Sequence, residues 1–310
     1  MRAARARGWQ ECRDAACVDA DVVVYAGVAD PPWDAVRALA PTARVSRFPG
    51  MSHVTEKDVM VGWLRDAGVD MDATVPETWT LPEDAERLAG AGLTRADDLI
   101  VKPANQRGGQ DIRLVTGDAV GLLEGRLVVQ RYEADVCTWR GAKFDLRMYV
   151  ILEDDAAYLV DEAMVRLCLR PYARPDETNR DDVHVHLTNT AINKDSKYEL
   201  HAWLADAFDA QARQDFLGRV DALLARVVCA MRAPLAVARR ETAIGCRPFQ
   251  ILGVDVLVRA DHVPVLVEIN ANPSLLAPTE TDWAIKGPVV AACFDLLDGK
   301  QPANVRLLRE

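Results

Sequence analysis

Two neighbouring apolar segments near the C-terminal end constrain the fold of this chain more than any other feature. Residues 249–258 and 263–269 are rich in Val, Leu and Ile and flank a short polar stretch at residues 259–262, which predicts a β-hairpin. Each predicted strand carries a carboxylate within its apolar run, Asp255 in the first and Glu268 in the second. A carboxylate in an apolar strand is costly unless a partner compensates it, and neither strand supplies a cation beside it.

The same hairpin presents a set of hard oxygen donors. Glu268 and Asn270 are two residues apart, so their side chains project from one face of the sheet. Carboxylate and amide oxygens are the ligands that Mg²⁺ takes when it is held against a nucleotide phosphate. Asp255, Glu268 and Asn270 are therefore predicted metal ligands. The alternative interpretation is a set of solvent-facing polar positions on a half-exposed hairpin.

A second predicted strand, residues 144–152, has one charged and one apolar face. Lys143, Asp145 and Arg147 alternate there with apolar residues. By itself the pattern favours a solvated outer face. The alternative is binding of phosphate or carboxylate, because arginine offers a planar fork to oxyanions and lysine a point charge.

A strand at residues 100–101 ends in Lys102 and leads into a glycine-containing loop that runs to Asp111. Such a loop can fold over a triphosphate, which its backbone N–H groups and the lysine would neutralise. The loop is not a Walker motif, because Gly-Lys-Ser/Thr is absent, and it is not Gly-x-Gly-x-x-Gly. A glycine loop alone is weak evidence for nucleotide binding.

A segment read as a strand carries two histidines, His184 and His186, and continues through Thr188 to Asn189. Two histidines at this spacing could bind zinc, but no Cys or third His stands at a suitable distance in the sequence. A hydrogen-bonding role for His186 and Asn189 near a phosphate and a purely structural loop fit the pattern equally well.

The remaining pattern predicts an α+β fold. Helices are expected at residues 56–67 and 200–231, the second broken once, and further strands at residues 22–25, 127–132 and 157–169. The strands cluster between helices instead of alternating strictly with them, which is typical of α+β layering.

Composition excludes several classes of protein. The 310 residues are 50% hydrophobic and 27% charged, which excludes wholesale disorder. The formal net charge of −10 argues against nucleic acid or an anionic membrane surface as the principal partner. No apolar run approaches the roughly 18 residues of a membrane span. Seven cysteines without a Cys-x-x-Cys pair indicate a reducing compartment, the cytoplasm.

Taken in order along residues 48–290, these motifs resemble the tubulin–tyrosine ligase-like family, amino-acid ligases of the ATP-grasp fold. The matching segments are residues 48–52 (Phe-Pro-Gly-Met-Ser), 55–58, 75–82, 101–103, 129–132, 143–147, 165–166, 186–189, 192–194, 253–257 and 266–275. One position departs from the family pattern. The family loop usually reads Arg-Gly-x-Gly-Ile, and here Asp111 stands before Ile112 in place of the last glycine. A carboxylate near a triphosphate is unfavourable, so altered lid closure or a loop register shifted by one is expected.

The resemblance implies an α+β ATP-grasp fold with the nucleotide between two antiparallel sheets. It divides the chain into an N-terminal subdomain at residues 1–90, a central subdomain at residues 91–170 and a C-terminal subdomain at residues 171–310. It assigns the metal to Asp255, Glu268 and Asn270, and phosphate and carboxylate binding and catalysis to Lys143, Arg147, Arg166, His186 and Asn189. It assigns the nucleotide to Lys102, Arg107, Gly108, Gly109, Gln130, Arg131, Tyr132 and Asp145, with adenine at Gln130 and the backbone of the two residues after it.

The activity that the resemblance implies is ATP- and Mg²⁺-dependent ligation of a free amino acid, glutamate in the leading version, to a carboxylate through an acylphosphate. The expected acceptor is tubulin or another acidic protein tail, in the cytoplasm and there at the cytoskeleton or cilium. The alternatives are tyrosine or glycine addition to tubulin, and a non-catalytic member that binds nucleotide or protein. Because the net charge opposes an acidic tail at long range, a targeting subunit is a further expected partner.

Overall fold

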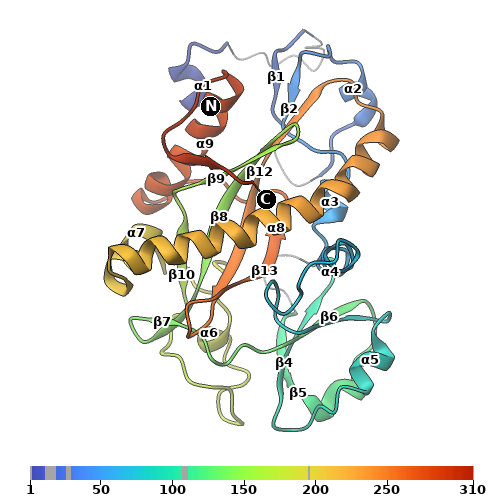
Figure 1. Ribbon diagram of the computed structural model, residues 1–310, viewed down its shortest axis with the longest axis vertical. Coiled ribbons are helices and arrows are strands. Elements are labelled where there is room, and N and C mark those ends of the chain that lie inside the picture. Colours follow the sequence, from blue (N-terminus) through green and yellow to red (C-terminus); the bar gives the residue numbers. More distant parts are fainter. Residues whose placement is uncertain (1, 11–18, 26–28, 107–110, 195, 310) are drawn as a thin grey trace.

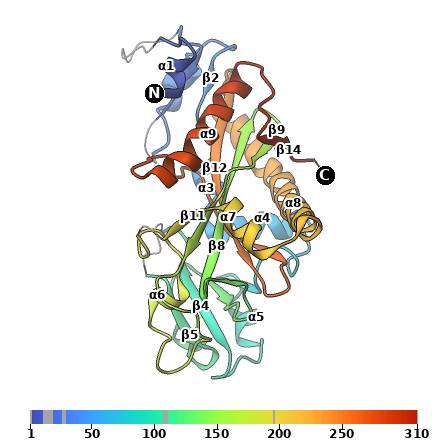
Figure 2. The ribbon, with the colours of Figure 1, turned by 90° about the vertical axis from the view of Figure 1, so that its left-hand side faces the viewer.

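The computed structural model describes residues 2–10, 19–25, 29–106, 111–194 and 196–309, which form two β-sheets with helices around them (Figure 1). The smaller sheet has four antiparallel strands in the order β3 (Thr78–Leu81), β6 (Leu127–Arg131), β4 (Asp98–Pro103) and β5 (Arg113–Thr116). Figure 2 shows this sheet at one end of the molecule, below the larger sheet.

The larger sheet is built on two long strands, β8 (Ala142–Glu153) and β12 (Arg247–Val258), which pair antiparallel with each other. The strands that pair with β8 are β7 (Thr138–Trp139), β9 (Ala156–Val160) and β10 (Met164–Leu167). β13 (Pro264–Asn270) pairs with β12, β11 (Lys197–Glu199) with β10, and β14 (Val305–Leu307) with β9. β1 (Val22–Val23) and β2 (Arg44–Val45) extend one edge by parallel pairing.

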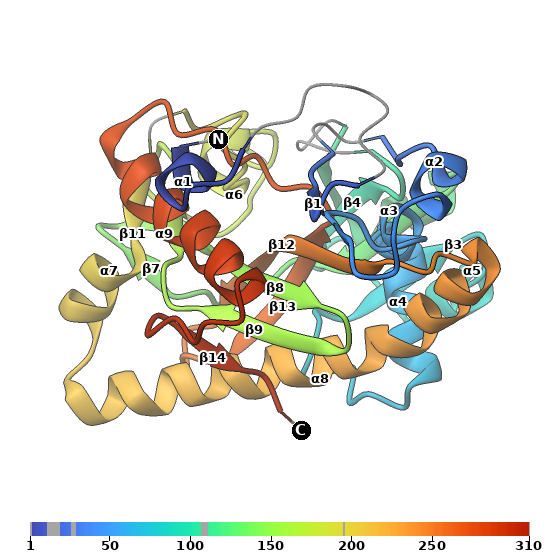
Figure 3. The same cartoon turned by 90° about the horizontal axis from the view of Figure 1, so that it is seen from above.

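Helices surround both sheets. They are α1 (Arg2–Ala6), α2 (Trp33–Arg37), α3 (Met51–Val54), α4 (Lys57–Asp66), α5 (Ala85–Ala89), α6 (Val183–His186), α7 (Leu200–Ala207), α8 (Ala210–Thr242) and α9 (Glu280–Leu297), with a 3₁₀ turn η1 at Gly117–Leu122. α8 lies along one side of the larger sheet, beside β9 and β14 (Figure 3).

The alternation in β8 decides which face of the larger sheet forms the core. Phe144, Leu146 and Met148 are fully buried and belong to the same core cluster as Val220 and Leu224 of α8. Because side chains alternate across a strand, the charged residues between them project from the opposite face. That face is turned away from α8.

Close packing against α8 explains the glycine of the Phe-Pro-Gly-Met segment. Gly50 has a φ of 73°, and a Cβ built there would lie 2.4 Å from the Cβ of Ala238 in α8. Glycine adopts this left-handed conformation without strain and leaves room for the crossing helix. α3 can therefore cross α8 at close range.

These elements confirm the predicted α+β class, the C-terminal hairpin and the single break in the long helical region, which falls between α7 and α8. Three element predictions are wrong. The long helical region does not end at residue 231, because α8 continues to Thr242. The strand predicted at residues 157–169 is interrupted at residues 161–163, where Asp161 and Glu162 turn to Arg306 and Asn304. The segment with two histidines is not a strand but the short helix α6, because Asp182 caps it by accepting from the backbone N–H of His184 at 3.1 Å.

Candidate active site

A cavity of about 660 Å³ opens between the two sheets, and most of the predicted site residues line it. The smaller sheet contributes residues of β4 and β6, and the larger sheet residues of β8, β10, β12 and β13. The predicted residues that line it are Lys102, Gln130, Arg131, Tyr132, Lys143, Asp145, Arg166, His186, Asn189, Asp255 and Glu268.

The charged face of β8 is buried here, so its interpretation as a solvated outer face is wrong. Lys143 is 6% exposed and Asp145 is 3% exposed. Thr188, which follows α6, donates its hydroxyl to Asp145 Oδ2 at 2.6 Å. The charged face of this strand therefore forms one wall of the cavity.

Asp255 has two cation partners that the hairpin itself does not supply. The strand register places it opposite Arg147 of β8, and β10 brings Arg166 beside both. Arg147 Nη2 donates to Asp255 Oδ2 at 2.9 Å, and Arg166 Nη2 lies 2.9 Å from the same oxygen. Arg166 Nε also donates to Asp145 Oδ1 at 2.7 Å. Burial would raise the pKa of Asp255, but the two guanidinium groups hold it well below its ordinary value.

Gly253 leaves the space that this network needs. A Cβ at that position would lie 3.0 Å from Cδ of Arg147 and 2.9 Å from Cβ of Pro273. A larger residue would displace the guanidinium that pairs with Asp255.

The two lysines of the cavity form no ion pair with a carboxylate in the part of the chain that the structure describes. Lys102 Nζ donates to Gln130 Oε1 at 2.5 Å, and the Gln130 amide donates to Thr78 Oγ1 at 2.9 Å. Lys143 Nζ lies 3.9 Å from the centroid of the Tyr132 ring. Burial lowers the pKa of Lys102 and of Lys143 to about 8. Buried cations without a counter-ion are costly, so this part of the cavity favours an anionic ligand.

The predicted metal ligands lie together at one end of the cavity. Asn270 Nδ2 lies 3.0 Å from Glu268 Oε1 and 3.5 Å from Asp255 Oδ2. A half-turn of the Asn270 amide would aim its oxygen at the same space. Within the described ranges no group of three or more His, Cys, Asp or Glu could hold a metal ion. Two carboxylates and one amide nevertheless fit Mg²⁺, which takes its remaining ligands from phosphate and water.

At the other end of the cavity, the strand predicted to hold adenine has its backbone donors engaged. The N–H of Arg131 donates to the carbonyl of Glu77 at 2.8 Å, and the N–H of Tyr132 to the carbonyl of Asp98 at 2.9 Å. Because these donors are engaged, this edge offers a purine the carbonyl groups and the side chain of Gln130.

His186 connects the two walls of the cavity. Its Nδ1 lies 2.9 Å from the hydroxyl of Tyr132, and its Nε2 lies 3.1 Å from the carbonyl of Asn179. Burial and the charge of Lys143 lower the pKa of His186, which favours the neutral ring. Both ring nitrogens face protein atoms, so His186 orients Tyr132 and the loop at residues 173–182.

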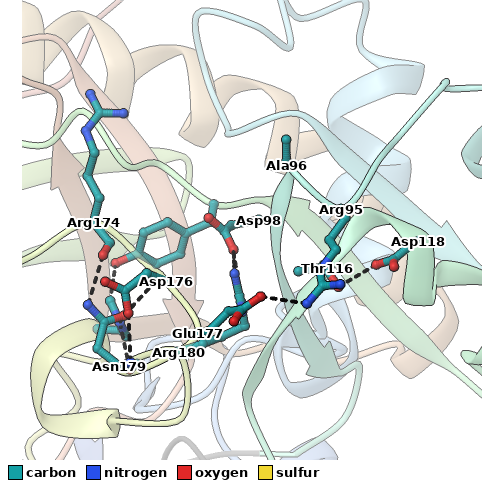
Figure 4. Close-up of polar contacts among 12 residues, drawn as sticks. Arg95, Ala96, Asp98, Thr116, Asp118, Arg174, Asp176, Glu177, Asn179 and Arg180 are labelled. Carbon is teal, nitrogen blue, oxygen red and sulfur yellow. Dashed lines mark hydrogen bonds and ion pairs between the residues drawn. The ribbon is translucent and has the colours of Figure 1, made fainter.

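Ion pairs tie that loop to the smaller sheet (Figure 4). Arg180 Nη2 lies 2.9 Å from Asp98 Oδ1, and Arg95 Nη2 lies 2.6 Å from Glu177 Oε1. Asp176 closes the turn by accepting from the backbone N–H of Thr178 at 2.7 Å. The loop that leads into α6 is thereby held against β4.

A second cavity, of about 890 Å³, adjoins the metal end and contains a residue to which the sequence assigned no role. This residue is Lys57, at the start of α4. Its Nζ lies 3.8 Å from Glu268 Oε2 and donates to the carbonyl of Gln106 at 2.6 Å. Asn270 and Asn272 line the same space, and Asn272 Nδ2 is buried without a hydrogen-bond partner among the described residues. The only signal for Lys57 was its place in the Thr-Glu-Lys-Asp block.

The predicted glycine-loop residues Arg107, Gly108 and Gly109 lie outside the described residues. Asp111, the first described residue after this loop segment, is exposed and has a φ of 55°. Glycine enters this left-handed region freely, and aspartate is one of the few other residues that tolerate it. The aspartate therefore has a backbone conformation that a glycine at this position would adopt without strain.

Comparisons with known proteins agree on one family. A family model described as tubulin-tyrosine ligase family matches residues 37–305. Tubulin polyglutamylase ttll-5 of Caenorhabditis elegans is 29% identical over 86% of this chain and 42% of its own length. Tubulin polyglutamylases TTLL7 and TTLL11 of Mus musculus are 27% and 28% identical over 82% and 76% of this chain. The chain spans less than half the length of each of these relatives, 31% of TTLL7 and 37% of TTLL11. In the described part of the chain, no helix combines the length and apolar character needed to cross a membrane.

Proposed function

The chain belongs to the tubulin-tyrosine ligase family, and we propose that it joins an amino acid to a carboxylate of an acidic protein acceptor at the expense of ATP. Its two sheets with the cavity between them form the α+β ATP-grasp arrangement of that family. Relatives that are named tubulin polyglutamylases support glutamate as the amino acid and tubulin as the acceptor. The observation that carries the proposal is the cavity itself, in which two buried lysines that have no carboxylate partner among the described residues face the predicted metal ligands.

The two buried lysines and the strand predicted to hold adenine define how ATP would lie. Adenine would occupy the end of the cavity at Gln130 and Tyr132, and the phosphates would extend toward Glu268. Lys102 would bind the α- and β-phosphates and Lys143 the γ-phosphate, since a polyanion supplies the counter-charges that these two lysines lack. Mg²⁺ held by Asp255, Glu268 and Asn270 would neutralise further phosphate charge.

Ligation needs an activated acceptor, because a carboxylate oxygen is a poor leaving group. In the first step an acceptor carboxylate oxygen bonds to the γ-phosphorus, and the bond from that phosphorus to the β–γ bridging oxygen breaks. The products are an acylphosphate and ADP. The α-amine of the amino acid then attacks the acyl carbon, the bond from that carbon to the phosphate oxygen breaks, and the amine loses a proton. An amide and inorganic phosphate result.

The basic residues would stabilise the charge that develops in transfer. Lys143 is fixed over Tyr132, and Arg147 and Arg166 are fixed by buried carboxylates. Groups that are already oriented need no reorganisation when charge moves between phosphate oxygens. Each guanidinium has five N–H donors, so pairing with Asp255 leaves donors for the γ-phosphate or for a substrate carboxylate.

The second cavity would admit the acceptor. In-line phosphoryl transfer requires the nucleophile on the side opposite the leaving ADP. With adenine at the end of the first cavity that Gln130 and Tyr132 line, that side is the second cavity, beyond Glu268, where Lys57 lies. An acceptor carboxylate would there replace Glu268 as the partner of the lysine.

The test measures ATP-dependent mass increase of tubulin and of an acidic tail peptide with glutamate, tyrosine or glycine as the only amino acid. The expected product carries added glutamate residues. The variant Glu268→Gln should abolish turnover and keep the fold, because no arginine among the described residues pairs with Glu268 and would be left without its partner. Its circular dichroism and thermal melting serve as the control for folding. Ligation by this variant at the wild-type rate would refute the assignment of Glu268.

Addition of tyrosine or glycine alone would change the amino acid and keep the mechanism. ATP binding without a mass increase on any acceptor would instead favour a nucleotide-binding member without ligase activity.

A further inference from the structure

The long helix α8 carries a row of arginines whose charge is not balanced within the described structure. They are Arg213, Arg219, Arg226, Arg232, Arg239 and Arg240, and none forms an ion pair with a described residue. Of the three carboxylates on the same helix, Asp221 pairs with Arg306 and Asp215 accepts from Gln211, whereas Glu241, next to Arg240, forms no ion pair with a described residue. This concentration of unbalanced positive charge stands out in a chain of net charge −10.

The C-terminal half of α8 borders a groove. Two cavities of about 1280 and 920 Å³ share Asp155, Ala156, Val228 and Arg232, so they form one continuous depression, named here the α8 groove. It lies between α8, the turn from β8 to β9 and the segment after β14, which run beside each other in Figure 3. Its apolar lining includes Leu152, Val228, Met231, Leu235 and Ile244.

Arginines outnumber unpaired carboxylates around this groove. Arg232, Arg239 and Arg240 line one cavity, and Arg232 and Arg309 the other. The carboxylates that face them are those of Asp154, which Arg247 pairs at 2.5 Å, and of Asp155. The only hydrogen bond from these arginines to a described groove residue is from Arg232 Nη2 to the backbone carbonyl of Asp155 at 3.3 Å. The lining is thus apolar in the middle and positive at the edge.

Helix chemistry accounts for only part of this arrangement. Arg239 and Arg240 lie in the last turn of α8, where positive charge is favoured by the helix dipole. Arg232 lies seven residues before Arg239, outside the last turn, and Arg309 belongs to another segment. The dipole therefore does not explain why four guanidinium groups gather around one apolar depression.

The α8 groove is separate from the candidate active site. α8 packs on the face of β8 that carries Phe144 and Leu146, whereas the cavity between the sheets lies on the face that carries Lys143 and Asp145. The larger sheet stands between them. A molecule in the groove would not reach the phosphate-binding residues.

We propose that the α8 groove docks an acidic segment of a partner protein, with apolar side chains of that segment on the groove floor. Arginine pairs carboxylates through two parallel hydrogen bonds and is enriched at the centres of protein interfaces. The apolar floor favours a polypeptide over a nucleic acid, whose backbone offers no matching apolar groups. This surface would hold a targeting or acceptor protein while the opposite face performs chemistry.

The test is fluorescence anisotropy with a labelled peptide in which Glu and Leu alternate over about 16 residues. The double variant Arg232→Glu/Arg239→Glu reverses two charges at the edge of the groove and should weaken binding roughly tenfold at low salt. Ala236→Glu should weaken binding by a similar factor. Ala236 is an exposed lining position, and glutamate is a good helix former there. The matched control is Arg219→Glu, an exposed arginine of the same helix outside the groove, which should change affinity less than about twofold.

Two further probes test each half of the proposal. A peptide with Ser in place of Leu and one with Gln in place of Glu should both bind more weakly than the parent. Equal loss in Arg219→Glu would show a diffuse charge effect and overturn the proposal. Single-stranded DNA that binds as tightly and with the same sensitivity to Arg232→Glu/Arg239→Glu would overturn it as well. So would binding that the groove variants leave unchanged.

Discussion

The two buried arginines and the two buried lysines of the cavity differ in how their charge is balanced. Arg147 and Arg166 lie against Asp145 and Asp255, and although burial alone would lower their pKa values, these carboxylates raise both. Among the described residues, Lys102 has only a neutral amide as its hydrogen-bond partner, and its pKa falls to about 8 on burial. The charges of the two arginines are balanced within the folded protein, whereas the two lysines have no carboxylate partner among the described residues.

The difference separates two roles that the sequence could not distinguish. The arginine network fixes the strands β8, β10 and β12 relative to one another and holds Asp255 in its ionised form. The lysines lower the free energy of unfolding of the ligand-free protein, because a buried charge without a partner destabilises the folded state. We therefore expect the arginine network to contribute more to stability than the lysines do, in addition to its proposed part in binding phosphate or carboxylate.

The largest expected effect is on the arginine side. Asp255→Asn removes the carboxylate that Arg147 and Arg166 share, and breaking a buried pair by removing one partner typically costs about 3–5 kcal/mol. Urea denaturation followed by circular dichroism measures this loss. Glu268→Gln is the control, because Glu268 is only partly buried and the cation that it pairs with among the described residues, Lys57, stands 3.8 Å away. An Asp255→Asn protein as stable as the wild type would show that the arginine side is not balanced by this carboxylate.

On the lysine side the same kind of change should act in the opposite direction. Lys102→Met removes a buried charge, so the free energy of unfolding at pH 7 should rise by roughly 1–3 kcal/mol. Nucleotide affinity, measured by calorimetry, should fall about ten- to hundredfold because a charge-assisted contact to phosphate is lost. A variant that loses both stability and affinity would contradict the distinction between the two sides.

The pH dependence follows from the lysine pKa values of about 8. Only protonated lysines attract phosphate, so affinity for ATP should be highest below pH 8 and fall up to about tenfold per lysine between pH 7 and 9. Stability has the opposite sign. Between pH 8 and the ordinary lysine value of 10.5 the unfolded chain binds more protons, so these two groups make folding more favourable as pH rises.

A matched variant isolates this titration. Lys102→Arg stays protonated across the range and should flatten the affinity profile relative to the wild type. Affinity and stability that fall together above pH 8 would point to general unfolding and not to titration of the lysines.

Sequence periodicity predicted what depends on near neighbours. The hairpin, the apolar alternation of β8 and the helix at Lys57–Asp66 all follow local rules, and the structure contains them. The cation partners of Asp255 could not be predicted that way, because Arg147 is 108 residues away in the chain and reaches it only through strand pairing. An alternating charged face also looks the same whether water or a second sheet covers it.

The same limit applies to the residues around the site. His184 and His186 have a spacing that fits a strand, and only the contact of Asp182 with the backbone shows that they begin a helical turn. Lys57 follows a recognisable block, but its distance to Glu268 depends on how α4 meets β13. The roles of the predicted site residues stay predictions until variants are measured.

The smallest expected effect extends the comparison to a pair that is not buried. Arg95 and Glu177 lie 2.6 Å apart, but their side chains are 74% and 77% exposed, so water solvates both charges already (Figure 4). Arg95→Gln should change the free energy of unfolding by less than about 0.5 kcal/mol, and less still at high salt. Chemical denaturation of Arg95→Gln, Glu177→Gln and the double variant gives the pairwise interaction as a thermodynamic cycle. Arg180 pairs with Asp98, whose side chain is only 18% exposed, so the variant Arg180→Gln should lose more free energy of unfolding than Arg95→Gln. If the exposed pair cost as much as Asp255→Asn, burial would not be what separates strong from weak charge pairs in this molecule.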